Sequence, residues 1–370
     1  MKKIKSLIIL YPSFERGGAT VNLINFVNTC AQKNIKIQLI SDIKKIDKRK
    51  FIKKNISFII LENKKNYKIF NRLITSIKSI FLLLNIFKKV DSNDSLVLSF
   101  QSHILPIIFS RVFGRKIVIR NSEDIIDATR YADHKFSALL VFLLKLSFYN
   151  LSSGVITNSN KAKNSLDKII FNNKTKLIYN PYLKKVLNKK NNKRDNLILS
   201  VGRLCKQKNQ TIAIKAFAIF LKKFPNYKLI LIGHGNDYKK LKNLCVSLNI
   251  VENVIFKGWV SDPKKYYIRS KILIFPSLYE GLPNTLIEAV NYNLPCISSR
   301  CSGASDILTN MHGSFVPRQN YEILAKKMIY AITNYKKTLS ENQKIKKKLS
   351  RFLIKPQVSK YLNFCNNLLN

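Results

Sequence analysis

Two acidic residues stand at one predicted strand-to-helix junction, in a chain that has 20 Asp and Glu against 66 Lys and Arg. Glu280 and Glu288 belong to the segment YEGLPNTLIEAV, which follows the apolar run ILIF. Pro283 lies between them and suits the first turn of a helix. Backbone N–H groups at a helix start bind phosphates, and acids in nucleotide-binding folds bind ribose diols. We therefore expect a phosphate here, with one carboxylate on sugar hydroxyls and the other on a ribose. The alternative is that these acids have no ligand: one is present because the first turn of a helix favours acidic residues, and the other is an exposed surface glutamate.

A second candidate anion site follows the apolar run LILSV. Gly202 and Arg203 end that run, and Lys208 comes at the opening of the next helix. Two cations at a helix N-terminus add to the helix dipole and its N–H groups, which fits a diphosphate. In a chain with a net charge of +46 the alternative is a solvated basic turn. Gly233 and Gly235, which flank His234 after the run KLILI, allow a tight turn or a close approach to a ligand.

The elements that must position these residues alternate between apolar strands and helices. Near-continuous apolar strands separated by helices predict parallel sheets covered on both faces, whose ligands bind at the carboxyl ends of the strands. The polar, aperiodic stretch KKVLNKKNNKRD interrupts the alternation and is typical of a linker. We therefore predict two doubly wound α/β domains. Their boundaries are 1–185 for the N-terminal domain, 186–195 for the linker, 196–350 for the C-terminal domain and 351–370 for a last helix.

Composition narrows the class of protein. The six cysteines form no CxxC pair and the four histidines lie far apart, which favours free thiols and no zinc site. The first apolar run is too short for a signal peptide, and no run reaches the length of a membrane-spanning helix. The runs Leu73–Val90 and Phe136–Leu151 are predicted to be buried helices with a basic edge; the alternative is that they lie in a membrane interface.

Together the motifs resemble the retaining GT-B glycosyltransferases of the glycogen-synthase-like family four, over nearly the whole chain. The pattern E-G-x-P-x-x-x-x-E from Glu280 to Glu288 follows G-R-x-x-x-x-K and a glycine-rich strand end, in that family's order. Three further stretches resemble family motifs: Gly17-Gly18 before a helix, YNPY at 179–182, and ISSRCSGASDIL…GSFVP at 297–317, in which Asp306 keeps the usual acid.

The resemblance implies a role for each matched residue. Arg203 and Lys208 would hold the donor diphosphate, Glu280 would act beside the reacting carbon, and Glu288 would bind the ribose. The other donor-binding residues would be Gly281, Leu282, Pro283, Asn284, Thr285, Gly17 and Gly18, with further contacts expected at His103, Arg120, Asn121 and Val260. As a lone histidine, His103 has the alternative of being an ordinary helix N-terminal residue. No metal or other cofactor is implied, because cations and helix N-termini would neutralise the leaving diphosphate.

The implied fold class is α/β, GT-B, with two Rossmann-like domains facing a central cleft: an N-terminal acceptor-binding domain and a C-terminal nucleotide-sugar-binding domain. The implied reaction is the transfer of a hexose, with retention of configuration, from a nucleotide sugar to a sugar acceptor. UDP is the nucleotide expected first, and GDP is the alternative. The resemblance to enzymes of bacterial O-antigen and capsule synthesis suggests a glycan linked to undecaprenyl diphosphate as that acceptor.

The positive net charge also leads to an expectation about where the protein lies in the cell. It suits an anionic membrane surface, so we expect a cytoplasmic protein that is peripheral on the inner membrane. A codon-bias effect on Lys, Asn and Ile content is the alternative explanation of the charge. The rival functions are a basic nucleic-acid-binding protein and a non-catalytic GT-B-like protein. No helix-turn-helix, zinc finger or RNP-like strand occurs, and the paired acids would have no role on nucleic acid, so no nucleic-acid partner is expected.

Overall fold

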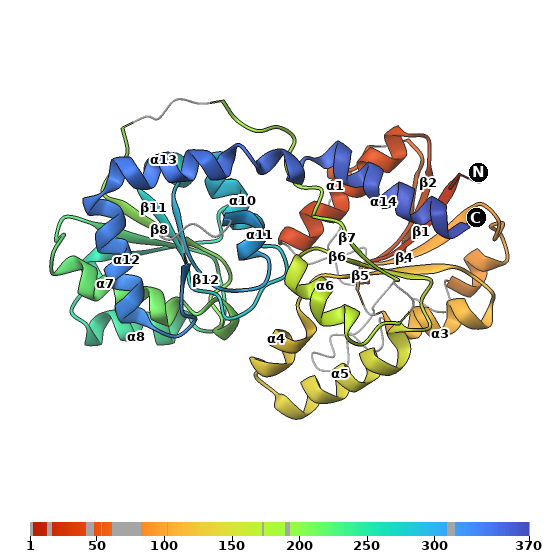
Figure 1. The fold of residues 1–370 in the computed structure, drawn as a ribbon, viewed down its shortest axis with the longest axis horizontal. Helices are drawn as coiled ribbons and strands as arrows, with labels where there is room; N and C mark the ends of the chain where they lie inside the picture. Colours follow the sequence, from red (N-terminus) through yellow and green to blue (C-terminus); the bar gives the residue numbers. More distant parts are fainter. Residues whose placement is uncertain are drawn as a thin grey trace. The chain divides into compact units, whose positions relative to one another are not determined.

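The computed structural model describes residues 3–12, 17–41, 48–52, 54–60, 83–101, 103–171, 174–188, 193–308 and 315–369. The chain divides into two compact units (Figure 1). The first consists of Met1–Ile125, His134–Lys184 and Arg351–Asn370, and the second of Ile126–Asp133 and Lys185–Ser350. Each unit is an α/β structure with its own sheet.

Among the described residues, the first unit has a sheet of seven parallel strands in the order β3-β2-β1-β4-β5-β6-β7. The strands are β1 (Ser6–Leu10), β2 (Lys36–Ser41), β3 (Ile56–Ile60), β4 (Ser95–Ser99), β5 (Ile117–Asn121), β6 (Gly154–Thr157) and β7 (Thr175–Leu177). The strand order reverses between β1 and β4, as in doubly wound folds. Every residue of β1, β4, β5 and β6 is buried, which explains why apolar residues predominate in these strands.

Alternate residues of β1 enter different cores, because successive side chains of a strand point to opposite faces. Leu7 and Ile9 join a cluster with α1 (Gly18–Gln32) and α14 (Ile354–Leu369). Ile8 and Leu10 join a second cluster on the other face. That cluster includes side chains of α3 (Ile104–Val112), α5 (Lys135–Tyr149) and α6 (Asn160–Asp167).

The last helix of the chain belongs to the first unit. Val358, Tyr361 and Cys365 of α14 are buried in the cluster with α1. A Cβ added to Gly154 would lie 2.8 Å from the ring of Phe364, so β6 needs a glycine where α14 crosses it. The chain therefore returns to its first sheet after completing the second.

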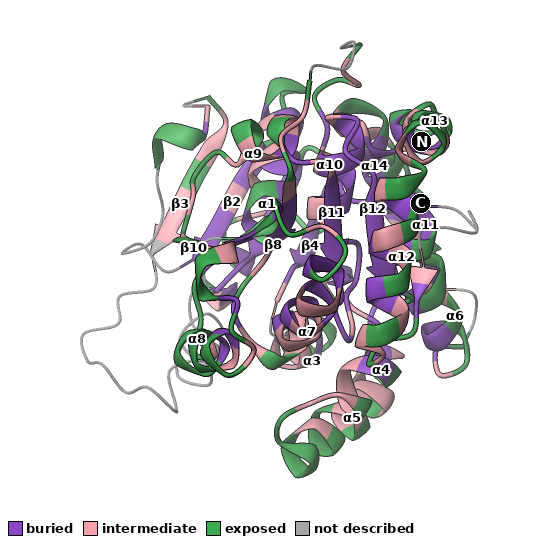
Figure 2. Ribbon diagram, turned by 90° about the vertical axis from the view of Figure 1, so that its left-hand side faces the viewer, coloured by how far each residue is buried: buried purple, intermediate pink, exposed green. Residues whose placement is uncertain are grey.

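The second unit has six parallel strands among its described residues, in the order β10-β9-β8-β11-β12-β13. The strands are β8 (Leu197–Val201), β9 (Lys228–Ile232), β10 (Val254–Gly258), β11 (Ile272–Phe275), β12 (Cys296–Ser299) and β13 (Phe315–Val316). The order reverses between β8 and β11, so the ends of these two strands form the switch point. Figure 2 shows β8, β11 and β12 largely in the colour of buried residues.

Helices cover both faces of this sheet (Figure 1). The helices of the second unit are α4 (Ile125–Arg130), α7 (Gln210–Leu221), α8 (Tyr238–Ser247), α9 (Lys264–Arg269), α10 (Asn284–Asn291), α11 (Ala304–Leu308), α12 (Tyr321–Thr333) and α13 (Tyr335–Lys346), α4 starting one residue before the unit boundary. Phe217 and Phe220 of α7 pack with Leu324 and Met328 of α12 over the strands.

Two helix starts differ from the sequence-based expectation. The helix expected from residue 207 begins with a 3-10 turn, Lys206–Lys208, and a left-handed Asn209 (φ 54°) separates that turn from α7. Pro283 precedes α10 as its N-cap, with φ −76° and ψ 103°, instead of occupying the first helical position. The first difference places Lys208 in the turn before α7, and the second places Pro283 in the loop before α10.

One burial prediction is wrong. The run Phe136–Leu151 forms α5, all of which the structure describes, and Tyr149 is its one buried side chain. The second run, Leu73–Val90, lies outside the described residues up to 82, and Leu83, Ile86 and Phe87 of its remainder are buried. Hydrophobicity alone made the two runs look alike, but tertiary packing gives α5 too few neighbours to cover it.

Candidate active site

The switch point of the second unit gathers the candidate residues of two loops. β8 and β11 are neighbours, with Ile198 opposite Ile272. Arg203 and Lys208 follow β8, and Glu280 follows β11. Because both strands run in the same direction, their following loops meet at one edge of the sheet.

Lys208 and Glu280 form an ion pair at this edge. Lys208 Nζ lies 2.5 Å from Glu280 Oε1, and the two side chains are only 16% and 11% exposed. The ammonium also lies 5.1 Å from the ring centroid of Phe275, the last residue of β11. The lysine stem passes over Gly202, where an added Cβ would lie 3.3 Å from Lys208 Cδ. The pair thus presents a cation suited to a phosphate beside a carboxylate suited to a hydroxyl.

Gln207 joins the two loops, and sequence reasoning missed it. Its backbone oxygen accepts from Leu278 N (2.8 Å), and its Nε2 donates to the carbonyl of Tyr279 (3.0 Å). Arg203 Nη2 donates to Gln207 Oε1 at 3.3 Å while the arginine side chain is exposed. The feature of the sequence that could have indicated this role is an amide side chain at a variable position of the G-R-x-x-x-x-K motif. Gln207 holds the loop before Glu280 against the turn that carries Lys208.

The segment before α10 is covered from the other side by the loop after β12. A Cβ added to Gly303 would lie 2.0 Å from the backbone oxygen of Gly281 and 2.7 Å from Leu282 Cα. Gly281, Leu282 and Pro283 are accordingly buried, whereas the following Asn284 and Thr285 at the start of α10 are partly exposed. First-turn N–H groups of a helix point out of its N-terminal end. The structure therefore brings this stretch next to Lys208 and Glu280, in an arrangement able to receive an anion.

The same loop contributes buried polar and thiol groups. Cys301 is buried, and burial together with the negative charge of Glu280 raises the pKa of its thiol to about 12. Asp306 of α11 is also buried. Residues 309–314 of the stretch 297–317 lie outside the described residues. Cys301 is therefore a neutral thiol beside the acid and supplies no nucleophile at neutral pH.

Glu288 is held by a residue that the sequence reasoning did not single out. The hydroxyl of Tyr267 on α9 donates to Glu288 Oε2 at 2.5 Å. The tyrosine ring is 1% exposed and stacks on Tyr292, with centroids 5.8 Å apart. Arg194 donates to the carbonyls of Tyr267 (2.7 Å) and Ser270 (2.6 Å), which anchors the end of α9. The carboxylate of Glu288 is thus oriented by a buried phenol.

The glycines after β9 bring backbone segments together. A Cβ on Gly233 would lie 1.9 Å from the carbonyl oxygen of Gly202, and one on Gly235 would lie 2.0 Å from that of Leu204. These contacts favour the alternative of a structural turn, one that shapes the loop holding Arg203. The ring of His234 lies under Gly258, whose added Cβ would be 3.0 Å from His234 Cε1.

Val260, which the resemblance implies to be a donor contact, follows a turn at Gly258. Gly258 has a φ of +62°, which favours glycine and turns the chain sharply after β10. Trp259 is exposed and Val260 is partly exposed. The turn therefore leaves backbone and side chains accessible at the end of the strand next to β9.

The remaining predicted residues lie in the first unit. Gly17 is the N-cap of α1, with extended backbone and open space where a Cβ would be, and Gly18 is the first residue of that helix. His103 is the N-cap of α3, and its Nδ1 is 2.9 Å from Ser99 Oγ. Burial, then the charges of Lys145 and Arg120, lower the pKa of His103 to about 3, so its ring is neutral.

Arg120 and Asn121 end β5 with buried side chains. Arg120 donates to Ser122 Oγ (2.6 Å), Asn180 Oδ1 (2.5 Å) and Tyr361 Oη (3.1 Å). Arg120 thus joins the end of β5 to Tyr361 of the returning helix α14, and Asn180 of the YNPY motif has a structural role as its acceptor. Contact of Arg120 or Asn121 with donor or acceptor stays a prediction.

Two features are absent from the residues that the structure describes, a metal-binding group of side chains and a membrane-spanning helix. No group of three or more His, Cys, Asp or Glu side chains is arranged there to hold a metal ion. No helix in the described part of the chain is long and apolar enough to span a bilayer. All six cysteines are free.

Comparison with known proteins decides the family of the second unit. Residues 184–348 match the family model described as Glycosyl transferases group 1. This part of the chain is a glycosyl transferases group 1 domain. The resemblance drawn from the motifs is therefore confirmed for the stretch that carries Arg203, Lys208, Glu280 and Glu288.

Curated relatives align with part of the chain. An uncharacterised glycosyltransferase of Methanocaldococcus jannaschii is 34% identical over 192 residues, which is 48% of this chain and 47% of the relative. The Campylobacter jejuni GalNAc-alpha-(1->4)-GalNAc-alpha-(1->3)-diNAcBac-PP-undecaprenol alpha-1,4-N-acetyl-D-galactosaminyltransferase is 35% identical over 156 residues, 41% of this chain and 43% of that enzyme. The chain spans about half the length of the curated relatives it matches.

Solved structures match nearly the whole chain in fold. The Anabaena protein HepE, in complex with UDP and glucose, has a TM-score of 0.76 at 18% identity, covering 97% of this chain and 98% of HepE. Sucrose-phosphate synthase from Thermosynechococcus elongatus has a TM-score of 0.81 at 15% identity, covering 98% and 99%. At these identities the likeness concerns the fold, and it confirms the predicted α/β GT-B fold class.

Proposed function

We propose that the chain is a glycosyltransferase that moves a hexose from a nucleotide sugar, a UDP-sugar first, to a sugar acceptor with retention of configuration. The observation that carries this proposal is the shielded ion pair at the switch point between Lys208, in the turn after β8, and Glu280, in the loop before α10. The group 1 domain spanning these residues supports it, as does the UDP bound to HepE, whose fold is similar.

The chemistry assigns one task to each side chain. Lys208, Arg203 and the first-turn N–H groups of α10 neutralise the diphosphate as the bond to the sugar breaks. Glu280 then accepts hydrogen bonds from the sugar hydroxyls, and Glu288, aligned by Tyr267, binds the ribose. The leaving phosphate takes the acceptor proton, so the step needs no covalent nucleophile. We infer that these cations replace a metal, and undiminished turnover in EDTA is the expected result.

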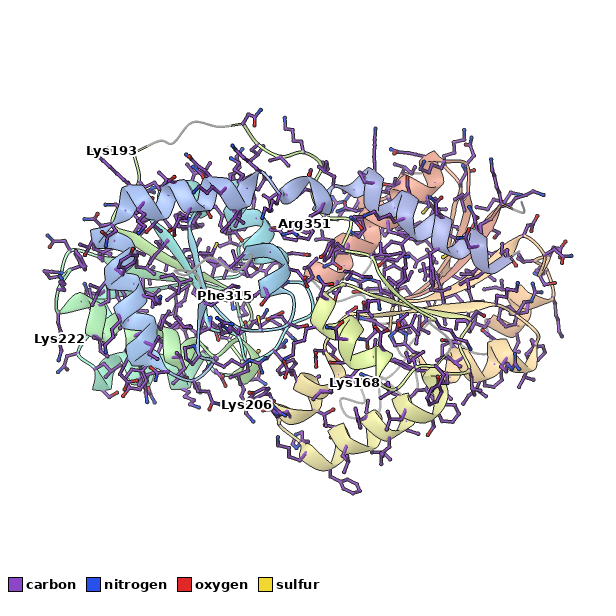
Figure 3. All side chains as sticks on the ribbon, viewed as in Figure 1. Lys168, Lys193, Lys206, Lys222, Phe315 and Arg351 are labelled. Carbon is purple, nitrogen blue, oxygen red and sulfur yellow. The ribbon has the colours of Figure 1, made fainter. Side chains whose placement is uncertain are left out.

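The proposed acceptor is a glycan linked to undecaprenyl diphosphate in bacterial surface polysaccharide synthesis. The relative from Campylobacter jejuni named above acts on such a compound by its name, and a Staphylococcus aureus relative is named as a capsular polysaccharide biosynthesis glycosyltransferase. We also propose that the protein works in the cytoplasm, attached to the anionic inner face of the membrane. Exposed lysines on both units, such as Lys168, Lys193, Lys206 and Lys222 in Figure 3, suit a general attraction to anionic surfaces.

The test is a panel of UDP- and GDP-sugars incubated separately with the purified chain, in which released nucleotide is measured over time. Release from one donor, lost in Glu280→Ala, is the expected result and names the sugar. If no donor is bound or cleaved and the protein instead binds DNA or RNA tightly in a salt-sensitive manner, the transferase proposal fails. The group 1 domain would then be inherited fold in a nucleic-acid-binding protein.

A further inference from the structure

Helix α5 turns a stripe of large apolar side chains away from the first unit. Phe136 is 83% exposed, and Leu139, Leu140 and Leu143 are each about half exposed. Their spacing of i, i+3, i+4 and i+7 places them on one side of an α-helix. Figure 2 shows α5 in the colours of exposed and intermediate residues along most of its length. Single exposed apolar residues are ordinary, but a continuous stripe indicates an interaction surface.

The opposite side of α5 is held by the unit. Tyr149 is buried in the core of the first unit and contacts the ring of His103, with centroids 5.9 Å apart. Phe142 packs against the same core. Lys145, whose side chain is 16% exposed, reaches Glu123 Oε1 at 3.7 Å. The side of α5 that carries Phe142, Lys145 and Tyr149 therefore faces the unit, and the apolar stripe faces away from it.

We propose that the outward stripe of α5 is a membrane-docking surface, which lies in the plane of a bilayer with anionic headgroups. This deepens the proposed membrane attachment by naming the element that inserts. An interfacial helix buries its apolar face just below the headgroups, and α5, with 15 residues, is shorter than the ~20 needed to cross the bilayer.

The positive charge of α5 favours an anionic lipid surface over a second copy of this chain as the binding partner of the stripe. The helix sequence KFSALLVFLLKLSFY contains two lysines and no acid, and Lys135 at its start is exposed. Helix α3, which packs against α5, ends with the exposed Val112, and Phe113 after it is exposed as well. An anionic bilayer offers apolar depth and negative charge together. A second copy of this chain would bring another +46 to the same interface, which opposes association.

The experiment is flotation of the full chain with vesicles of phosphatidylglycerol and phosphatidylethanolamine, compared with phosphatidylcholine alone. The test variant is Phe136→Ser/Leu140→Ser, which alters only exposed side chains. The matched control is Val246→Ser/Val251→Ser, at exposed apolar positions of the second unit. We expect wild type and control to float with the anionic vesicles, and the α5 variant to bind them about tenfold less or weaker still.

A fluorescent probe locates the contact. The chain has one tryptophan, Trp259, so Phe136→Trp in a Trp259→Phe background reports on α5 alone. Its emission should shift to the blue when anionic vesicles are added. Equal flotation of the α5 variant and wild type, or an unchanged emission spectrum in bound protein, overturns the proposal. So does a dimer of the wild type that the α5 variant loses. Nucleotide release in solution, measured on the wild type, the Phe136→Ser/Leu140→Ser variant and the matched control, reports on the proposed reaction separately, because these substitutions lie outside the donor site.

Discussion

The hydrogen bond from Tyr267 to Glu288 makes a quantitative prediction about donor binding. Tyr267→Phe removes the phenol oxygen, which lies 2.5 Å from Glu288 Oε2, and keeps the ring that stacks on Tyr292. A hydrogen bond to a charged group contributes about 1.5–3 kcal/mol. Glu288 is partly exposed, so water recovers part of this. We therefore expect a loss of about 1–2 kcal/mol, which corresponds to roughly a 5- to 30-fold lower kcat/KM.

The loss should appear mainly in KM, because the ribose is bound equally in the ground state and the transition state. Steady-state nucleotide release measures kcat and KM, and calorimetry measures the Kd of the free nucleotide. The control is Tyr266→Phe, which removes a phenol oxygen from the neighbouring, partly exposed residue of the same helix and should leave both unchanged.

A double-mutant cycle separates positioning of Glu288 from general damage. If Tyr267 acts through the carboxylate, Tyr267→Phe should cost nothing more in a Glu288→Ala background. An equal loss in both backgrounds, or no loss in the wild-type background, would refute the reasoning. Thermal unfolding of each variant checks that the buried ring position is still folded.

Three further predictions follow from the site and its supports. Lys208→Met should lower kcat about 100-fold in nucleotide release, because it leaves Glu280 and the diphosphate without their shielded cation; near-normal turnover would contradict this. Gly303→Ala should lower both activity and Tm, because its Cβ would lie 2.0 Å from the carbonyl oxygen of Gly281, and an unchanged melting curve would show that the contact is not needed. His103 binds a proton readily only when unfolded, since its folded pKa is about 3 against 6.5. Its contribution to stability is therefore present above pH 6.5 and lost as the pH falls toward 3. His103→Asn should reduce the gain in unfolding free energy between pH 5 and pH 7 by about 2 kcal/mol in urea titrations, and an unchanged gain would contradict the neutral, buried ring.

Local pattern was sufficient for much of this protein. The apolar runs LILSV, KLILI and ILIF coincide with β8, β9 and β11. A strand buried on both faces is mostly apolar along its length, so its sequence is easy to distinguish from that of a half-exposed strand. The acids of the Glu280–Glu288 motif were also visible, since a strand-to-helix junction in a parallel sheet is where ligands bind.

Tertiary structure decided what depends on neighbours distant in sequence. The exposed side of α5 could not be told from a buried one, because burial depends on what packs against a helix and not on its own hydrophobicity. Tyr267 became a partner of Glu288 only when α9 and α10 were placed together, and Gln207 gained its role only when the loops after β8 and β11 met. The sequence left Gly233 and Gly235 open to a tight turn or a close approach to a ligand, and their contacts with the backbone of Gly202 and Leu204 favour the turn. The sequence by itself determined the alternating α/β elements and the acidic and basic residues at the strand ends, since these rest on interactions within a few residues. The structure alone decided which side chains hold them and which faces stay uncovered, because those are properties of packing between segments that the chain order does not reveal.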